Sequence, residues 1–266
     1  MIAMKEPIIQ VKDLVVKYGN RTVLDGVNLD IYRGESIAIL GKSGCGKSTL
    51  LRHMIGLSSP TGGQILIRGK DIAPMQEEEK VEILKKIGML FQSAALFNSM
   101  TVGDNVALPL REHTSLEQST MRIMINMKLD SVGLSGFYDY KPSQLSGGMK
   151  KRAGLARALA MDPEILFCDE PSAGLDPVVA AGIDNLILKL KKAFKMTIIV
   201  VTHELASVDI IADRVAMMHQ GKILAVGGKD EMMNSSHPVI KQFFNREPDD
   251  ETVDRDKVLS TLISEV

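Results

Sequence analysis

A glycine-rich segment that follows an apolar run is the part of this sequence best suited to binding phosphate. Residues 41–48 read GKSGCGKS and fit the pattern G-x-x-x-x-G-K-[ST]. Glycines let backbone N–H groups turn towards an anion, and the start of the next helix adds a favourable dipole. Lys47 would then reach the β- and γ-phosphates of a nucleotide, and the Ser48 hydroxyl would bind Mg²⁺. The other expected nucleotide contacts in this segment are Gly41, Ser43, Gly44, Cys45, Gly46 and Thr49.

This phosphate-binding loop (residues 41–48) also has simpler interpretations. A glycine-rich turn with a chance Lys-Ser pair would need no ligand, but three glycines at this spacing between a strand and a helix argue against it. Cys45 could fill space in the loop, or it could be a thiol that ionises readily at the start of a helix.

Two adjacent carboxylates follow a second apolar segment. Residues 165–168 read ILFC and lead into Asp169 and Glu170. Ligands of open α/β sheets bind beyond the carboxyl ends of the strands, where these side chains would lie. Asp169 is expected to hold Mg²⁺ through its water shell, and Glu170 to polarise the water that attacks the γ-phosphate as a general base. The alternative is that the two carboxylates form an acidic surface turn. The presence of the phosphate-binding loop in the same sequence argues against this alternative.

His203 follows the apolar residues 197–201 and Thr202, at the same expected sheet edge. A solitary histidine is usually structural. Because this strand should lie beside the others that carry polar residues, we expect His203 to contact the γ-phosphate.

The elements that must position these residues alternate between strands and helices. This order predicts an α/β fold with a mainly parallel, mixed sheet and an N-terminal antiparallel part. The strands are expected at 8–16, 23–31, 36–40, 64–67, 88–91, 165–168, 197–201, 215–218 and 222–226. Helices are expected at 48–57, 76–86, 115–134, 149–161 and 177–192, with a short one from Glu204.

Composition limits the class of protein. The chain has 266 residues, 32 Lys plus Arg against 33 Asp plus Glu, and a formal net charge of −1. This balance argues against a chain that coats nucleic acid or anionic lipid by bulk charge. Its 2 cysteines favour a reducing compartment. Apolar runs are strand-sized, and the first residues do not resemble a signal peptide, so we expect a cytoplasmic protein without its own membrane span.

Two regions stand outside the strand–helix alternation. Residues 115–134 are rich in methionine (Met121, Met124 and Met127 among them), which predicts core packing of an amphipathic helix. After Asn245 the chain is first charge-dense and then apolar on one helical face. We therefore expect one domain at 1–245, with a helical lobe at about 93–162, and a tail at 246–266 that is either frayed or an amphipathic contact helix.

Residues 145–149, LSGGM, precede a basic helix and resemble the signature segment of ABC-type ATPases. The resemblance covers about residues 7–245. It implies that Tyr18 stacks on adenine, that Gln92 is a catalytic residue near Mg²⁺, and that Asp176 lies in the loop after the carboxylates. It further implies a head-to-tail homodimer in which the signature of one subunit faces ATP on the other. Ser146, Gly147 and Gly148 would supply those contacts, whereas Met149 replaces the common Gln and lacks its amide donor.

A narrower resemblance is to the ATPase of Mla-type, MCE-associated phospholipid transport systems, carried by residues 89–97, 105–114 and the LSGGM form. It implies a membrane permease as partner, an MCE-type lipid-binding protein, and a position on the cytoplasmic face of the inner membrane. Leu96, Phe97 and Met100 are then candidates for permease contact, or for packing within the helical lobe. No nucleic-acid partner is expected.

Other classes fit less well. An ABC ATPase of cofactor assembly without a permease is the main alternative. A repair ATPase would carry coiled coils or zinc sites, and a translation-type factor would carry two ATPase copies. A nucleotide sensor that binds without turnover would not need Lys47, Asp169, Glu170 and His203 together.

Overall fold

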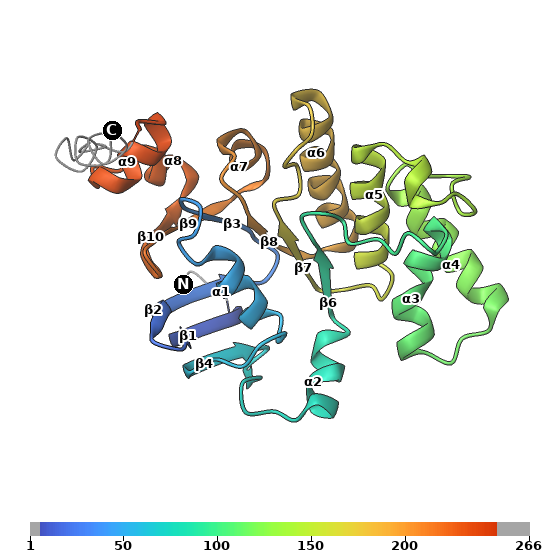
Figure 1. Cartoon of the computed structure of the whole chain (residues 1–266), viewed down its shortest axis with the longest axis horizontal. Helices are drawn as coiled ribbons and strands as arrows, with labels where there is room; N and C mark the ends of the chain where they lie inside the picture. The colour runs from blue at the N-terminus through green and yellow to red at the C-terminus, as the bar shows by residue number, and fades with distance from the viewer. Residues whose placement is uncertain (1–5, 249–266) are drawn as a thin grey trace, which may run out of the picture.

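Two β-sheets and the helices around them form the structure, a computed structural model that describes residues 6–248 (Figure 1). In this part of the chain one sheet has the strand order β2-β1-β4-β5 and the other the order β10-β9-β3-β8-β7-β6. Residues 1–5 and 249–266 lie outside the description, and with them most of the tail that the sequence predicts to be either frayed or an amphipathic contact helix. Across residues 6–248, none of the helices combines the length and apolar character that crossing a membrane requires.

The first sheet is antiparallel, as predicted. It contains β1 (Pro7–Tyr18), β2 (Arg21–Tyr32), β4 (Gly62–Ile67) and β5 (Lys70–Asp71). The alternation of apolar and polar residues in β1 and β2 buries one face of the hairpin against the core and leaves the other polar.

The second sheet is parallel except for its last strand. The first strand of this sheet in the chain, β3 (Ser36–Leu40), lies between two strands that come more than 150 residues later. SIAIL in β3 and TIIVV in β8 are buried along their whole length, as strands covered on both faces require. The remaining strands are β6 (Ile87–Leu90), β7 (Ile165–Asp169), β8 (Thr197–Val201), β9 (Arg214–His219) and the antiparallel β10 (Lys222–Gly228).

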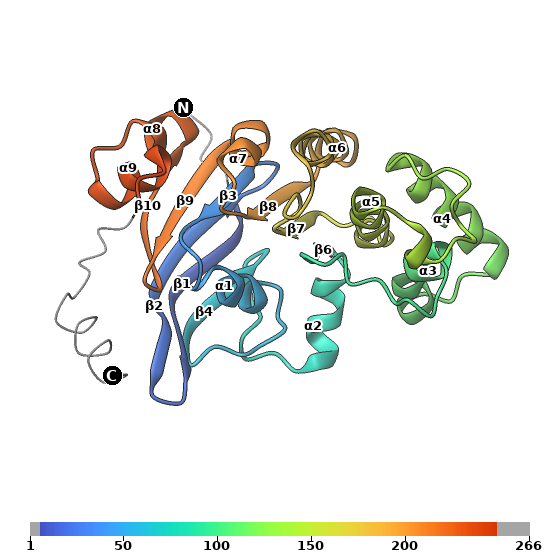
Figure 2. The same cartoon turned by 45° about the horizontal axis from the view of Figure 1, so that its top comes forward.

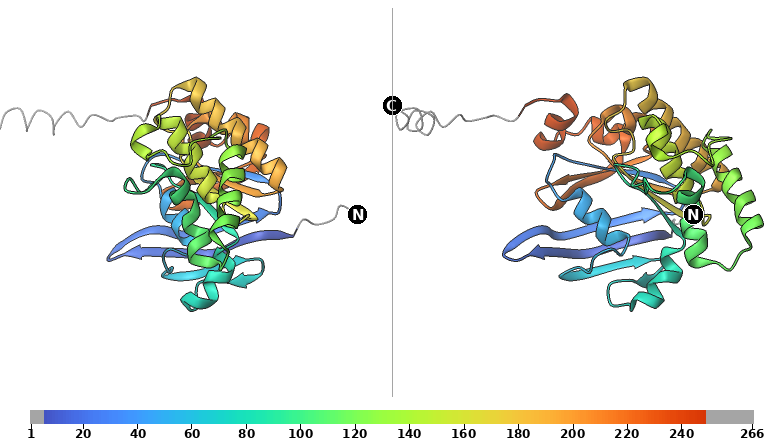
Figure 3. Two further views of the ribbon diagram at one scale, coloured as in Figure 1. Left: turned by 90° about the vertical axis from the view of Figure 1, so that its right-hand side faces the viewer. Right: turned by 45° about the vertical axis from the view of Figure 1, so that its right-hand side comes forward.

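Helices cover both faces of the second sheet. α1 (Lys47–Met54) lies between the two sheets and shares one apolar core with both (Figure 3). On the other face α6 (Pro177–Phe194) and α5 (Gly147–Ala158) pack against β7 and β8. The shorter helices are α2 (Glu77–Leu84), α7 (Leu205–Ile211), α8 (Lys229–Met233) and α9 (Pro238–Asn245).

A helical group stands beside the sheets (Figure 2). α3 (Val102–His113) and α4 (Gln118–Ser131) pack with α5 around an apolar cluster that includes Val106 and Leu129. The short 3-10 helix η1 (Pro142–Gln144) precedes α5. The prediction for the methionines is only partly correct. Met121 and Met124 pack against this cluster, but Met127 is exposed because it lies on the outer face of α4.

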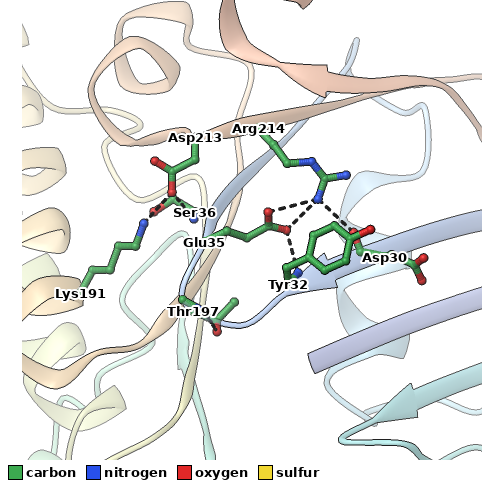
Figure 4. A network of polar contacts seen from close by, with 9 residues as sticks. Asp30, Tyr32, Glu35, Ser36, Lys191, Thr197, Asp213 and Arg214 are labelled. Carbon is green, nitrogen blue, oxygen red and sulfur yellow. Dashed lines mark hydrogen bonds and ion pairs between the residues drawn. The ribbon is translucent and has the colours of Figure 1, made fainter. Parts of the chain in front are cut away.

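A polar network joins the two sheets at the end opposite the carboxyl ends of the parallel strands (Figure 4). The buried Glu35 carboxylate accepts hydrogen bonds from the Tyr32 N–H at 2.8 Å and from Arg214 Nη1 at 2.9 and 3.1 Å. Next to it, the Asp213 carboxylate accepts from the Ser36 N–H at 2.8 Å. These contacts satisfy buried backbone groups at the start of β3 and tie it to β9.

Candidate nucleotide-binding site

The phosphate-binding loop connects β3 to α1, so a buried strand and a helix hold its two ends. Gly41, Gly44 and Gly46 have φ angles of 155°, 77° and 110°, which residues with a side chain rarely adopt. The Lys47 ammonium lies across the loop and donates to the carbonyls of Gly41 at 2.7 Å and Lys42 at 3.1 Å. The structure therefore places Lys47 and Ser48 at the start of α1, where the helix dipole favours an anion.

The turn between β9 and β10 holds this loop in place, which the sequence motifs do not reveal. The Gly221 N–H donates to the Cys45 carbonyl at 3.0 Å, and the Gly221 carbonyl accepts from the Asp25 N–H at 3.0 Å. A Cβ on Gly41 would lie 2.4 Å from the Met218 carbonyl oxygen, so β9 also requires glycine there. The phosphate-binding loop is thus wedged between β2 and the end of β9.

The hypothesis of a readily ionised Cys45 thiol is wrong. Burial raises the pKa of Cys45, and the nearby Lys47 ammonium opposes this only in part. The thiol fills space against Gly41, where a Cβ would come 2.6 Å from Sγ.

Glu170 and His203 meet at the carboxyl ends of β7 and β8. The His203 Nδ1–H donates to Glu170 Oε1 at 2.7 Å, and the Thr202 hydroxyl donates to Oε2 at 3.2 Å. Glu170 has a φ of 47°, a left-handed conformation that costs on the order of 1–3 kcal/mol for a residue with a side chain. Its N–H donates to the Val201 carbonyl at 2.8 Å, so neighbouring strands hold the strained residue. The His203 side chain is 54% exposed, so it can also reach a ligand.

Asp169 ends β7 on the same edge, and α1 contacts this strand. Burial raises the pKa of Asp169, the charge of Glu170 raises it further, and Arg52 and Lys47 oppose both effects. Within residues 6–248 no group of three or more His, Cys, Asp or Glu could hold a metal ion. A carboxylate and a hydroxyl, Asp169 and Ser48, still suit Mg²⁺, because this ion keeps several waters and takes its remaining ligands from substrate phosphates.

The residues after β6 form a glutamine loop, residues 91–100, that α5 holds. Gln92 is exposed, and its main-chain carbonyl accepts from Lys151 Nζ at 2.6 Å. Ala94 and Ala95 have φ angles of 60° and 47°, and their carbonyls accept from Arg157 at 2.9 and 2.7 Å. Burial lowers the pKa of both Lys151 and Arg157.

The signature segment, residues 145–149, lies apart from the phosphate-binding loop of the same chain (Figures 1 and 2). Ser146 begins α5, and its hydroxyl accepts from the Met149 N–H at 3.3 Å. A Cβ on Gly148 would lie 2.6 Å from Val179, so α5 approaches α6 closely there. Asp176 caps α6 by accepting from two of its N–H groups. Tyr18, at the end of β1, is exposed.

Behind the site lies a polar cluster that sequence reasoning missed. Asp184 on α6 is only 1% exposed, and its Oδ1 atom has no hydrogen-bond partner in the described residues. Burial raises the pKa of Asp184, while Ser207 and Ser172 hydrogen bonds oppose this. Asp184 and Ser207 line a cavity of about 710 Å³ that reaches Ser43 and His203. An aspartate within a helix otherwise rich in apolar residues was the available signal.

Three features together define an ATP-binding cassette. They are a phosphate site between a strand and a helix, a Glu–His pair at the adjoining sheet edge, and a separate helix that starts with glycines. Residues 24–173 match the ABC transporter family, and the chain belongs to this family. It is an ATP-binding and ATP-hydrolysing subunit of an ABC transporter.

Relatives in sequence include the intermembrane phospholipid transport system ATP-binding protein MlaF of Haemophilus influenzae, 42% identical over 92% of this chain and 93% of the relative. The probable ribonucleotide transport ATP-binding protein mkl of Mycobacterium leprae is 43% identical over 89% of this chain and 68% of the relative. The dimeric post-hydrolysis structure of the cassette MJ0796, bound to ADP and Pi, has a TM-score of 0.76 at 32% identity and covers 83% of this chain and 98% of its own. Together they confirm the predicted fold class and the resemblance.

Proposed function

We propose that this ATPase drives phospholipid transport through a membrane permease and works as a homodimer. The observation that carries the substrate class is the MlaF relative, which matches nearly the full length of both chains. The mkl relative, named for ribonucleotide transport, matches at similar identity but over a smaller share of its own length. The dimer is supported by the solved cassette dimers of similar fold.

In the proposed reaction Lys47 and the backbone of the phosphate-binding loop hold the β- and γ-phosphates, while Tyr18 stacks on adenine. Glu170 accepts a proton from the attacking water, because its carboxylate already lies at the sheet edge and His203 holds it at 2.7 Å. Mg²⁺, held by Ser48, Asp169 and Gln92 when bound, would neutralise charge on the phosphates. His203 would contact the γ-phosphate with its second ring nitrogen.

The second half of each site would come from the partner subunit. Ser146, Gly147 and Gly148 cannot serve their own phosphate-binding loop, because α5 lies at the helical end of the molecule (Figure 2). A head-to-tail dimer brings each signature to the ATP of the other subunit, and Asp176 lies in the loop that would cross between the two. This arrangement makes the isolated subunit's site incomplete.

Permease contact is proposed at a groove beside the glutamine loop. A cavity of about 530 Å³ lies between α2, β6, α3 and α5, and apolar side chains form most of its lining, among them Val81, Leu84, Met89, Phe91, Phe97 and Met161. Phe97 is 55% exposed at its edge, whereas Leu96 and Met100 are partly buried and contribute less than the sequence suggests. A short amphipathic helix of a permease would fill this groove.

The test is purification of the full-length protein from membranes in mild detergent, followed by identification of bound proteins and lipids. A permease, an MCE-type lipid-binding protein and phospholipid are expected, with the ATPase on the cytoplasmic face of the inner membrane. Phe97→Arg should lose the permease, while Ile123→Arg on α4, where Ile123 is 64% exposed, serves as the matched control. Recovery with assembly factors alone, or with a nucleotide transporter, would contradict the phospholipid assignment.

A further inference from the structure

Lys151 on α5 is a buried cation whose contacts none of the sequence motifs explains. It is 5% exposed, and its ammonium donates to the main-chain carbonyls of Gln92 at 2.6 Å and Glu170 at 3.0 Å. These carbonyls follow β6 and β7, which are neighbours in the sheet. One ammonium group therefore joins the helix that starts with the signature, the glutamine loop and the residue proposed as general base.

Two further residues on the same face of α5 strengthen this connection. Gly154 allows the helix to approach the glutamine loop, since a Cβ there would lie 2.9 Å from Leu90 and 3.1 Å from Ala94. Arg157 then binds the carbonyls of Ala94 and Ala95. Residues three apart lie on one side of a helix, so α5 and the glutamine loop are held as one body.

The contact with Glu170 matters because this residue is strained. In the left-handed conformation, with a φ of 47°, its peptide orientation depends on outside partners. Val201 accepts from the Glu170 N–H, and Lys151 donates to the Glu170 carbonyl. Because Lys151 lies on α5, movement of this helix would shift the Lys151 ammonium, and with it the Glu170 carboxylate relative to His203.

We propose that Lys151 is a positioning residue for ATP hydrolysis, which ties the signature at the start of α5 to the backbone of Gln92 and Glu170. When the signature of one subunit binds ATP on the partner, the shift of α5 reaches the general base of its own site through Lys151. The two sites of the dimer are thereby coupled. This coupling rests on the proposed head-to-tail dimer, whereas the positioning of Glu170 does not.

The test compares Lys151→Met, which removes the donors, with Lys151→Arg, which keeps cationic donors. Lys150→Met is the matched control, because Lys150 is the neighbouring lysine on α5 and is less buried than Lys151. Hydrolysis by the full-length protein is measured against ATP concentration, with affinity and binding stoichiometry from a fluorescent ATP analogue. Lys151→Met is expected to lose kcat on the order of tenfold to hundredfold at nearly unchanged affinity, and its Hill coefficient should fall towards one. Lys151→Arg should restore most of the wild-type kcat and Hill coefficient, and Lys150→Met should match the wild type.

A merely structural role gives a different result. Binding stoichiometry and activity would fall together in Lys151→Met, and the Hill coefficient would stay at the wild-type value, which overturns the proposal. If this variant does not fold, Lys151→Leu removes the donors with a different side-chain shape, and wild-type kcat and cooperativity in it would equally overturn the proposal. A wild-type Hill coefficient of one would refute the coupling between the two sites. The loss of kcat at unchanged affinity in Lys151→Met would still decide whether Lys151 positions Glu170.

Discussion

Replacing Glu170 by Gln separates the loss of a proton acceptor from the loss of a structural contact. The carboxylate accepts hydrogen bonds from His203 Nδ1 at 2.7 Å and from the Thr202 hydroxyl at 3.2 Å. A Gln side chain has the same shape, but only its Oε1 atom can accept. One of the two hydrogen bonds is lost, at a cost to folding stability of about 1 kcal/mol.

The expected loss of turnover is larger than this structural cost. A general base contributes on the order of 10²- to 10⁴-fold to a rate, which corresponds to roughly 3–5 kcal/mol of barrier. Glu170→Gln should therefore lower kcat by this factor while the melting temperature changes little. ATP binding should persist, because the phosphate-binding loop is untouched, and the unhydrolysed nucleotide should stabilise the dimer.

Phosphate release at saturating ATP measures turnover, thermal unfolding measures stability, and light scattering during size-exclusion chromatography measures the ATP-dependent dimer. His203→Ala is a useful companion variant, since it leaves the carboxylate but removes its 2.7 Å partner. Turnover of Glu170→Gln within about threefold of the wild type would refute the role of Glu170 as general base.

Further predictions concern the loop, the buried aspartate and the glycine contacts. Lys47→Ala should weaken productive phosphate binding and lower kcat/KM by about tenfold or more, measured by steady-state hydrolysis, and unchanged activity would remove Lys47 from the mechanism. Burial raises the pKa of Asp184, so the folded state binds this proton more tightly than the unfolded chain, and stability falls as pH rises through the raised pKa. Asp184→Asn should therefore raise the free energy of unfolding by about 1–3 kcal/mol near neutral pH and by less in acid. Thermal unfolding checks this, with Asp139→Asn at an exposed position as the control. An equal gain in stability at both pH values would contradict the raised pKa of Asp184. Gly41→Ala would place a Cβ 2.4 Å from the Met218 carbonyl oxygen, so this variant should not bind nucleotide in an equilibrium binding assay. Wild-type affinity in the variant would show that the loop can move away from β9.

Local patterns in the sequence were enough to predict the strands and helices that carry the site. The alternation in β1 and β2 and the apolar runs of β3, β7 and β8 each follow from which faces are buried, and the structure confirms them. Strand–loop–helix order also placed the phosphate-binding loop and the Asp169–Glu170 pair on one sheet edge. These features depend on neighbouring residues, which a sequence displays directly.

Contacts between distant segments were beyond such reasoning. Nothing near Cys45 indicates that Gly221 bonds its carbonyl, or that burial raises the pKa of its thiol. Lys151 belongs to a basic helix whose charges would ordinarily face solvent, and only the packing of α5 against the glutamine loop turns it inward. The position of Asp184 beside Ser172 and Ser207 likewise depends on how α6 meets α7.

The place of β3 in its sheet has a consequence for synthesis of the protein. Its two neighbours, β8 and β9, leave the ribosome long after β3, and the turn whose Gly221 holds the phosphate-binding loop follows them. A nascent chain that ends before residue 214 lacks one neighbour of β3 and the partner of the Cys45 carbonyl, so long-range pairing must wait for nearly the whole chain. Formation of the phosphate-binding loop is therefore expected only after these late strands and their turn have been made.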